Sequence, residues 1–158
     1  MSERDSFEEY VAARRSALLR TAYLLAGHRE DAEDLVQVAL VKAVPHWGRI
    51  ADDPEPYVRR ILARESVSRW RRRRWREVHT GAVPETQVEE PGDDRLALQA
   101  ALARLAPRQR AVIVLRYYED LTEAETARVL GISVGTVKSQ TRDALARLRV
   151  DAVDTVRT

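Results

Sequence analysis

A set of polar residues near the start of one predicted helix has the types and spacing of a DNA-reading surface: Thr136, Lys138, Ser139, Gln140 and Arg142. Amine and guanidinium groups bind phosphates and base acceptors, and hydroxyls and amides bind either. Lys138, Ser139 and Arg142 are the best candidates for base edges, whereas Thr136 and Gln140 suit phosphates. We therefore favour DNA binding over an ordinary helical hairpin with a solvated polar face.

Two predicted helices joined by a tight turn position these residues, within 121–149. Thr122 and Glu125 have capping-box spacing, so a helix should begin at Glu123. Gly131 should end that helix in the left-handed conformation, and Ser133 should cap the next one. The residues predicted to face inward are Ala127, Leu130, Val137, Ala144, Leu145 and Leu148. This pattern is typical of a helix-turn-helix that enters the major groove.

The first half of the chain has three stretches with apolar residues at helical spacing. Ser6 and Glu9 have capping-box spacing for the first helix, which Gly27 should end. The second should run from about residue 29 to 44, stopped by Pro45. The third should begin at Asp53 and Pro54 and extend to about residue 78. Together they predict one small bundle.

Residues 79–93 have two prolines, two glycines and no periodicity, so they are predicted to be a flexible acidic linker. After it, Leu98, Leu102 and Leu105 indicate a helix that ends near Pro107. Pro107 opens another helix, with Val112, Leu115 and Tyr118 predicted to face inward. We expect an all-α fold with two small helical domains, over residues 6–78 and 94–150.

The charge pattern also favours a polyanion partner. The chain has 158 residues and a net charge of +2, and its cations are almost all arginine. Six arginines lie within residues 69–76, and the acidic linker follows them. Such asymmetry is typical of a nucleic-acid-binding face.

Several other functions are disfavoured by composition. Cysteine is absent, which excludes disulfides and thiolate metal sites. His28, His46 and His79 are scattered without metal-ligand spacing. No catalytic motif or phosphate loop is present, so we expect no catalytic residue, cofactor or metal. The sequence has no apolar run resembling a signal peptide or membrane span, which predicts a cytoplasmic protein without membrane insertion.

Five segments in order resemble a bacterial RNA polymerase sigma factor of the extracytoplasmic-function group, in its SigE-like subfamily. They are DAEDLVQ at 31–37, PEPYVRRIL at 54–62, WRRRRW at 70–75, LAPRQRAVIVLRYYEDL at 105–121 and VLGISVGTVKSQ at 129–140. The resemblance covers roughly residues 6–150. It implies a sigma2-like bundle of three or four helices and a sigma4-like helix-turn-helix domain.

The resemblance also implies partners. Such factors bind core RNA polymerase at its clamp helices and flap, bind promoter DNA at the −10 and −35 elements, and are commonly held by an anti-sigma factor. They have no catalytic residues and no cofactor. The alternatives are an autonomous helix-turn-helix regulator and a sigma-mimicking adaptor that binds an anti-sigma factor.

The resemblance assigns two further sets of residues. Polymerase docking is implied for Asp31, Glu33, Asp34 and Gln37, and the recognition helix of the second domain is implied to read the −35 element. Contact with the −10 element is implied for Arg59, Arg60, Arg64, Ser68, Arg71 and Arg72. Trp70 or Trp75 is a candidate to stack on an unpaired base.

The chain departs from the family pattern at several positions. Val38 and Leu40 replace a usual glutamate and aromatic residue, which affects the docking segment. Arg64 replaces an asparagine tied to reading a flipped base. Thr126 replaces an aliphatic residue and is expected to soften a small core. Asp143 replaces an arginine. It is a candidate to accept a hydrogen bond from cytosine N4, but we favour an ion pair with Arg147.

Overall fold

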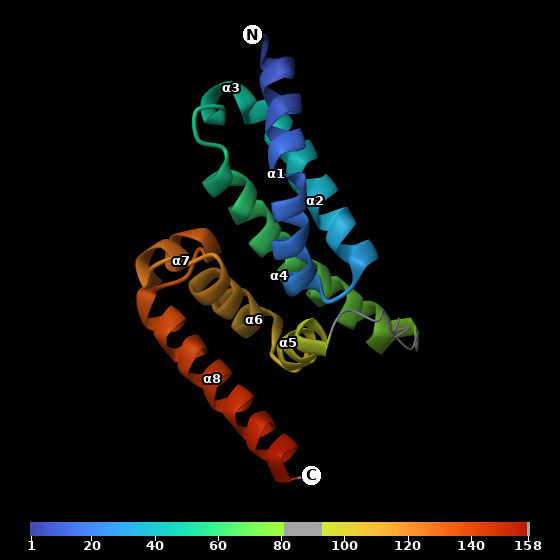
Figure 1. Ribbon diagram of the computed structural model, residues 1–158, viewed down its shortest axis with the longest axis vertical. Coiled ribbons are helices and arrows are strands. Elements are labelled where there is room, and N and C mark those ends of the chain that lie inside the picture. The colour runs from blue at the N-terminus through green and yellow to red at the C-terminus, as the bar shows by residue number, and fades with distance from the viewer. Residues whose placement is uncertain (81–92, 158) are drawn as a thin grey trace.

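The computed structural model describes the backbone of residues 1–80 and 93–157, and every regular element in these ranges is helical (Figure 1). The first unit holds α1 (Glu3–Ala26), α2 (Arg29–Ala43), η1 (Val44–His46), α3 (Trp47–Ile50) and α4 (Glu55–Thr80). The second unit holds α5 (Asp93–Ala103), α6 (Pro107–Ile113), η2 (Val114–Tyr118), α7 (Glu123–Leu130) and α8 (Val134–Arg157). The predicted all-α fold is confirmed.

The helix ends of the first unit follow local signals, with one exception. Gly27 has a φ of +83° and ends α1 as predicted. The start of α1 differs, because the Ser2 hydroxyl accepts a hydrogen bond from the Asp5 amide at 3.1 Å. Ser6, the predicted cap, lies inside the helix. Its hydroxyl instead accepts a hydrogen bond from the Trp47 indole at 3.2 Å.

The core of the first unit lies between α1, α2 and α4. Leu35, Val36, Val58 and Leu62 are at most 1% exposed. At one end of this core, Trp47 is buried against Phe7, with ring centroids 5.1 Å apart in an edge-to-face arrangement. This contact fixes the connection between α2 and α4 against α1.

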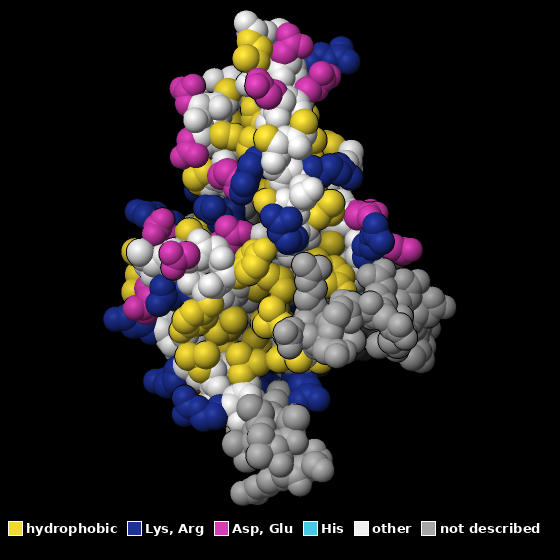
Figure 2. All heavy atoms as spheres, viewed as in Figure 1, with side chains coloured by type: hydrophobic (Ala, Val, Ile, Leu, Met, Phe, Trp, Pro, Cys, Tyr) yellow, Lys and Arg dark blue, Asp and Glu magenta, His cyan; other side chains and the backbone are white. Residues whose placement is uncertain are grey.

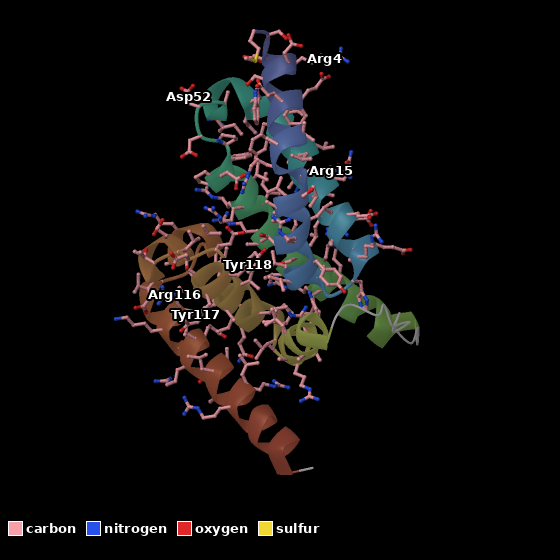
Figure 3. All side chains as sticks on the ribbon, viewed as in Figure 1. Arg4, Arg15, Asp52, Arg116, Tyr117 and Tyr118 are labelled. Atoms are coloured by element: carbon pink, nitrogen blue, oxygen red, sulfur yellow. The ribbon has the colours of Figure 1, made fainter. Side chains whose placement is uncertain are left out.

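In the second unit, a π-helical turn follows α6. The Glu119 amide donates to the Val114 carbonyl at 3.0 Å, a hydrogen bond between residues five apart. The extra residue in this turn shifts the helical phase. Tyr118, predicted to face inward, is therefore 47% exposed, and it projects from η2 beside Tyr117 (Figure 3). The inward prediction is also wrong for Leu145, which is 36% exposed at the edge of the apolar face of α8.

The two units lie against each other, with α6 and α7 beside the middle of α4 (Figure 1). Ala63 of α4 packs in one buried cluster with Leu115, Leu121 and Val129 of the second unit. The predicted linker falls almost wholly on residues 81–92, which lie outside the described residues. Helix α4 continues to Thr80 and α5 begins at Asp93.

Candidate nucleic-acid interface

The turn between α7 and α8 has the geometry that the sequence predicts. The Thr122 hydroxyl accepts from the Glu125 amide at 3.0 Å, and the Glu125 carboxylate accepts from the Thr122 amide at 3.1 Å. These hydrogen bonds, the backbone one foremost, lower the pKa of Glu125. Gly131 has a φ of +67°, and the Ser133 hydroxyl accepts from the Thr136 amide at 3.0 Å. The capping box, the left-handed glycine and the second cap are confirmed.

Helix α8 presents two exposed cations from the predicted DNA-reading set, Lys138 and Arg142. Ser139 and Gln140 are half-buried, and the Ser139 hydroxyl donates to the Thr136 carbonyl at 3.0 Å. The Thr136 hydroxyl in turn lies 2.9 Å from that of Ser133. The hydroxyl groups are therefore engaged within the first turns of α8, whereas both cations reach into solvent.

Arg142 is the ion-pair partner of Asp143. Its Nε lies 3.8 Å from the Asp143 carboxylate, and both side chains are exposed. The structure thus pairs Asp143 with its neighbour rather than with Arg147 as predicted. Exposed pairs of this kind contribute about 0–1 kcal/mol. Arg142 can exchange this carboxylate for a phosphate or a guanine edge at small cost.

The inward face of α8 is anchored by Val137, which is fully buried against Val112 of α6 and Ala127 of α7. Next to Ala127, Thr126 is also fully buried, and its hydroxyl has no hydrogen-bond partner. A buried, unpaired hydroxyl costs about 1–3 kcal/mol. This burial is the physical basis for the expected softening of the small core.

The predicted −10 residues all lie on α4 and fall into two groups, according to whether they contact the second unit. Arg60, Arg71 and Arg72 are exposed and Ser68 is half-buried. Trp70 in the same stretch is 38% exposed. The side chain of Trp75, the other predicted stacking residue, lies outside the described residues. Among the described residues, Arg60, Arg71 and Arg72 form no hydrogen bond with the second unit, and they give this side of α4 a basic strip.

The second group, Arg59 and Arg64, contacts the second unit. Arg59 Nε lies 3.3 Å from the Glu119 carboxylate, with both side chains only 19% exposed. Arg64 Nε donates to the Val129 carbonyl at 2.8 Å. Arg59 is thus half-buried between the units, whereas Arg64 remains exposed while its guanidinium contacts α7.

The sequence did not predict several other contacts between the two units. Glu119 also accepts a hydrogen bond from the Thr21 hydroxyl of α1, 98 residues away. Gln99 Nε2 donates to the Tyr23 carbonyl at 3.2 Å, and Arg110 Nη1 donates to the Leu25 carbonyl at 3.1 Å. Burial lowers the pKa of the Arg110 guanidinium. No local pattern signals such pairs, because they depend on how the units pack.

The acidic residues predicted for polymerase docking lie on α2. Glu33, Asp34 and Gln37 are exposed and Asp31 is half-buried. Glu33 pairs with Arg29 at 3.4 Å, and Asp34 pairs with Arg69 of α4 at 3.7 Å. Surface pairs of this length are weak. Both carboxylates can therefore change partner when an arginine of another protein approaches.

The described residues offer no alternative site for metal chemistry. They contain no group of His, Asp or Glu side chains that could hold a metal ion. His46 Nδ1 instead lies 2.9 Å from Arg49 Nη2, and the side chain of His79 lies outside the described residues. Among the described helices, none has the length and apolar character needed to cross a membrane.

Helical units that carry a capped helix-turn-helix, an exposed basic recognition helix and a second arginine-lined helix are typical of DNA-binding proteins. The family described as Sigma-70 region 2 matches residues 10–76, and Sigma-70 region 4 matches residues 95–148.

Similar proteins agree with these matches. The chain is 45% identical to the RNA polymerase sigma-E factor of Streptomyces avermitilis, covering 90% of this chain and 83% of that one. It is 32% identical to the ECF RNA polymerase sigma factor SigL of Mycobacterium tuberculosis, covering 91% and 85%. The solved sigma factor RpoE in complex with the anti-sigma factor NepR from Bartonella quintana has a TM-score of 0.73 at 27% identity, covering 90% and 94%.

The chain belongs to the sigma-70 family of RNA polymerase sigma factors, in its extracytoplasmic-function group. It is thus a promoter-specificity factor, which acts with RNA polymerase in transcription initiation. The resemblance drawn from the five sequence segments is confirmed.

Proposed function

We propose that α8 reads the −35 element and the exposed strip of α4 contacts the −10 element, while the acidic edge of α2 docks on core polymerase. The observation that carries this proposal is the pair of exposed cations, Lys138 and Arg142, on a helix whose start and turn are fully capped. A rigid, correctly capped helix delivers these side chains to the major groove with little loss of conformational freedom.

Within the −10 set, we assign first contact to the described members that form no hydrogen bond or ion pair with the second unit: Arg60, Ser68, Arg71 and Arg72. Arginines along one helix neutralise phosphates, and Trp70 beside them can stack on an unpaired base. The functional units we propose are residues 6–78 and 94–150, with 79–93 as the tether. Two tethered modules bind one DNA more tightly than either alone.

We further propose that the protein works in the cytoplasm, has no catalytic activity of its own and is held by an anti-sigma factor. The chemistry of RNA synthesis then belongs entirely to the polymerase. Support for the anti-sigma partner comes from RpoE, which was solved with NepR, and from the structure of CnrH in complex with the cytosolic domain of CnrY, at a TM-score of 0.66 and 25% identity.

Transcription in vitro tests this proposal. Core polymerase, the purified protein and a library of promoter fragments are combined, and transcripts are sequenced. We expect specific transcripts that share a −35 and a −10 sequence and that disappear when the protein is omitted. Tight operator binding without polymerase, and no dependence of transcription on the protein, would show an autonomous regulator instead.

A further inference from the structure

We propose that Asp143 of α8 is a positioning residue for −35 recognition, which directs the guanidinium of Arg142 to a guanine edge and away from the DNA phosphates. The inference rests on the proposed function, because it refines the role assigned there to α8. It explains an acidic side chain on a helix that must approach a polyanion, where a carboxylate otherwise only weakens binding.

Arg142 and Asp143 lie together on the face of α8 that points away from the core. Val137 and Ala144, about two helical turns apart, are fully buried and therefore fix the rotation of the helix. The side chains of Arg142 and Asp143 are 79% and 59% exposed, so both charged groups are accessible to DNA. Any DNA group that Arg142 binds must therefore come close to Asp143 as well.

The ion pair occupies one edge of the Arg142 guanidinium. The contact with the Asp143 carboxylate is made through Nε, at 3.8 Å. A guanidinium has further N–H donors on its two Nη atoms, at the end of the side chain. These donors match the N7 and O6 acceptors that guanine presents in the major groove. Arg142 can therefore bind guanine end-on while Asp143 stays beside Nε.

A carboxylate in this place separates the two kinds of DNA partner by their charge. A phosphate carries a full negative charge, so binding it to Arg142 brings two like charges together. The acceptors of a guanine edge carry only partial charges, so their repulsion by Asp143 is smaller. A site that penalises the wrong contact gains specificity even if the right contact becomes no stronger. Asp143 thus favours base contact by Arg142 over phosphate contact.

The pair is weak in solvent and becomes stronger on DNA. In solvent, exposed charges of this kind are strongly screened, so Arg142 can change partner. When α8 enters the major groove, part of the surrounding water is displaced, and the same charges interact in a lower dielectric. The bias exerted by Asp143 is therefore largest in the bound state, where Arg142 takes either a base or a phosphate.

Binding of the holoenzyme to single-base −35 variants tests this proposal with Asp143→Ala, because alanine favours the helix and removes only the carboxylate. We expect discrimination to fall about two- to fivefold, the ratio typical of an exposed ion pair, at the position that Arg142→Ala also affects. Asp120→Asn is the matched control and should leave discrimination unchanged. It removes an exposed carboxylate of the same unit outside α8, and asparagine tolerates the positive φ of residue 120.

Binding of the full chain to duplex DNA of random sequence gives a second readout. Asp143→Ala should bind such DNA more tightly than the parent, because Arg142 then takes a phosphate. The slope of log affinity against log salt concentration should steepen by the equivalent of about one phosphate contact. Asp143→Glu keeps the charge and should stay close to the parent. An affinity for random DNA that does not change in Asp143→Ala would overturn the proposal.

The Arg142→Ala, Asp143→Ala double variant separates positioning from direct reading. If Asp143 acts through Arg142, the double variant discriminates no worse at that position than Arg142→Ala alone. A loss at a different position that persists without Arg142 would overturn the proposal, because Asp143 then accepts from a base itself. If the parent holoenzyme shows no preference among −35 variants, the proposed function fails and this inference with it. A preference that does not depend on Asp143 overturns this inference alone.

Discussion

Arg14 of α1 and Glu55 at the start of α4 form an ion pair at 2.8 Å, although 41 residues separate them in the chain. The Tyr10 hydroxyl donates to the same carboxylate oxygen at 2.9 Å. Burial alone would raise the pKa of Glu55, but the hydrogen bonds from Arg14 and Tyr10 outweigh it and lower the pKa. The burial of Tyr10 itself and its hydrogen bond to Glu55 raise the pKa of Tyr10. This triad ties the first helix of the bundle to its last.

The triad predicts how stability depends on pH. Because the pKa of Glu55 is lower in the folded than in the unfolded protein, its contribution is fully present above its ordinary value of 4.5. The contribution is lost as pH falls through the folded pKa. Urea unfolding between pH 7 and 3 should therefore show a shallower acid decline for Glu55→Gln than for the parent. Glu8→Gln, at an exposed surface pair, is the control, and equal declines in all three proteins would contradict the prediction.

Thr126→Val should stabilise the protein by about 1 kcal/mol, because the isosteric methyl group removes a buried hydroxyl without a partner. Thr122→Val, four residues earlier, should do the opposite and cost about 1 kcal/mol, since it removes the cap of α7. Thermal unfolding of the two variants measures both effects. A lower midpoint for Thr126→Val than for the parent would mean that the hydroxyl is paired in solution.

Arg142→Ala should weaken −35 recognition by about 1–3 kcal/mol at one base position and leave the others unchanged. The physical reason is the loss of a guanidinium that can bind a guanine edge with two hydrogen bonds. Competition binding on a set of single-base −35 variants, with the holoenzyme, measures it. Arg147→Ala, further along α8, serves as the matched arginine control. Uniform weakening on every sequence would instead assign Arg142 to a phosphate.

Charge reversal at Asp31 and Asp34 to lysine should reduce association with core polymerase at least tenfold, because it places like charges against a basic partner surface. Glu30→Lys, exposed on the same helix outside the docking set, is the control. Affinity is measured with labelled protein and core polymerase in the absence of DNA. Association that survives the double reversal unchanged would show that α2 docks through other residues.

The caps and the turn of the helix-turn-helix were predictable to the residue because their signals are local. A capping box, a left-handed glycine and a second cap each depend on residues three or four apart, and Thr122, Gly131 and Ser133 all have the predicted geometry. The five sequence segments were sufficient for the family. The core residues of α2 were also predictable, since a regular helix preserves the apolar spacing.

The predictions that differ depend on non-local packing or on irregular helix geometry. Tyr118 turned outward because one π turn shifts the phase that regular spacing assumes. Ser6 does not cap α1, because the helix begins earlier, with Ser2 as its cap. The Ser6 hydroxyl instead accepts a hydrogen bond from the Trp47 indole. Arg59 and Arg64 belong to a basic stretch in the sequence, and only the arrangement of the two units gives them protein partners. Hydrophobic side chains also gather on the face of the second unit seen in Figure 2. Tyr117 and Tyr118 of this unit are exposed, although the spacing had assigned Tyr118 to the interior.

The burial of Trp47 has an optical consequence. All three tryptophans, Trp47, Trp70 and Trp75, precede the tether, so indole emission reports on the first unit alone, whereas helical circular dichroism sums over both. If the contact between the two units makes the chain unfold as one cooperative body, denaturation curves from the two signals coincide. Once Glu119→Ala removes the contacts of Glu119 with Arg59 and Thr21, the curves should separate, and the difference between their midpoints then measures how strongly one unit supports the other.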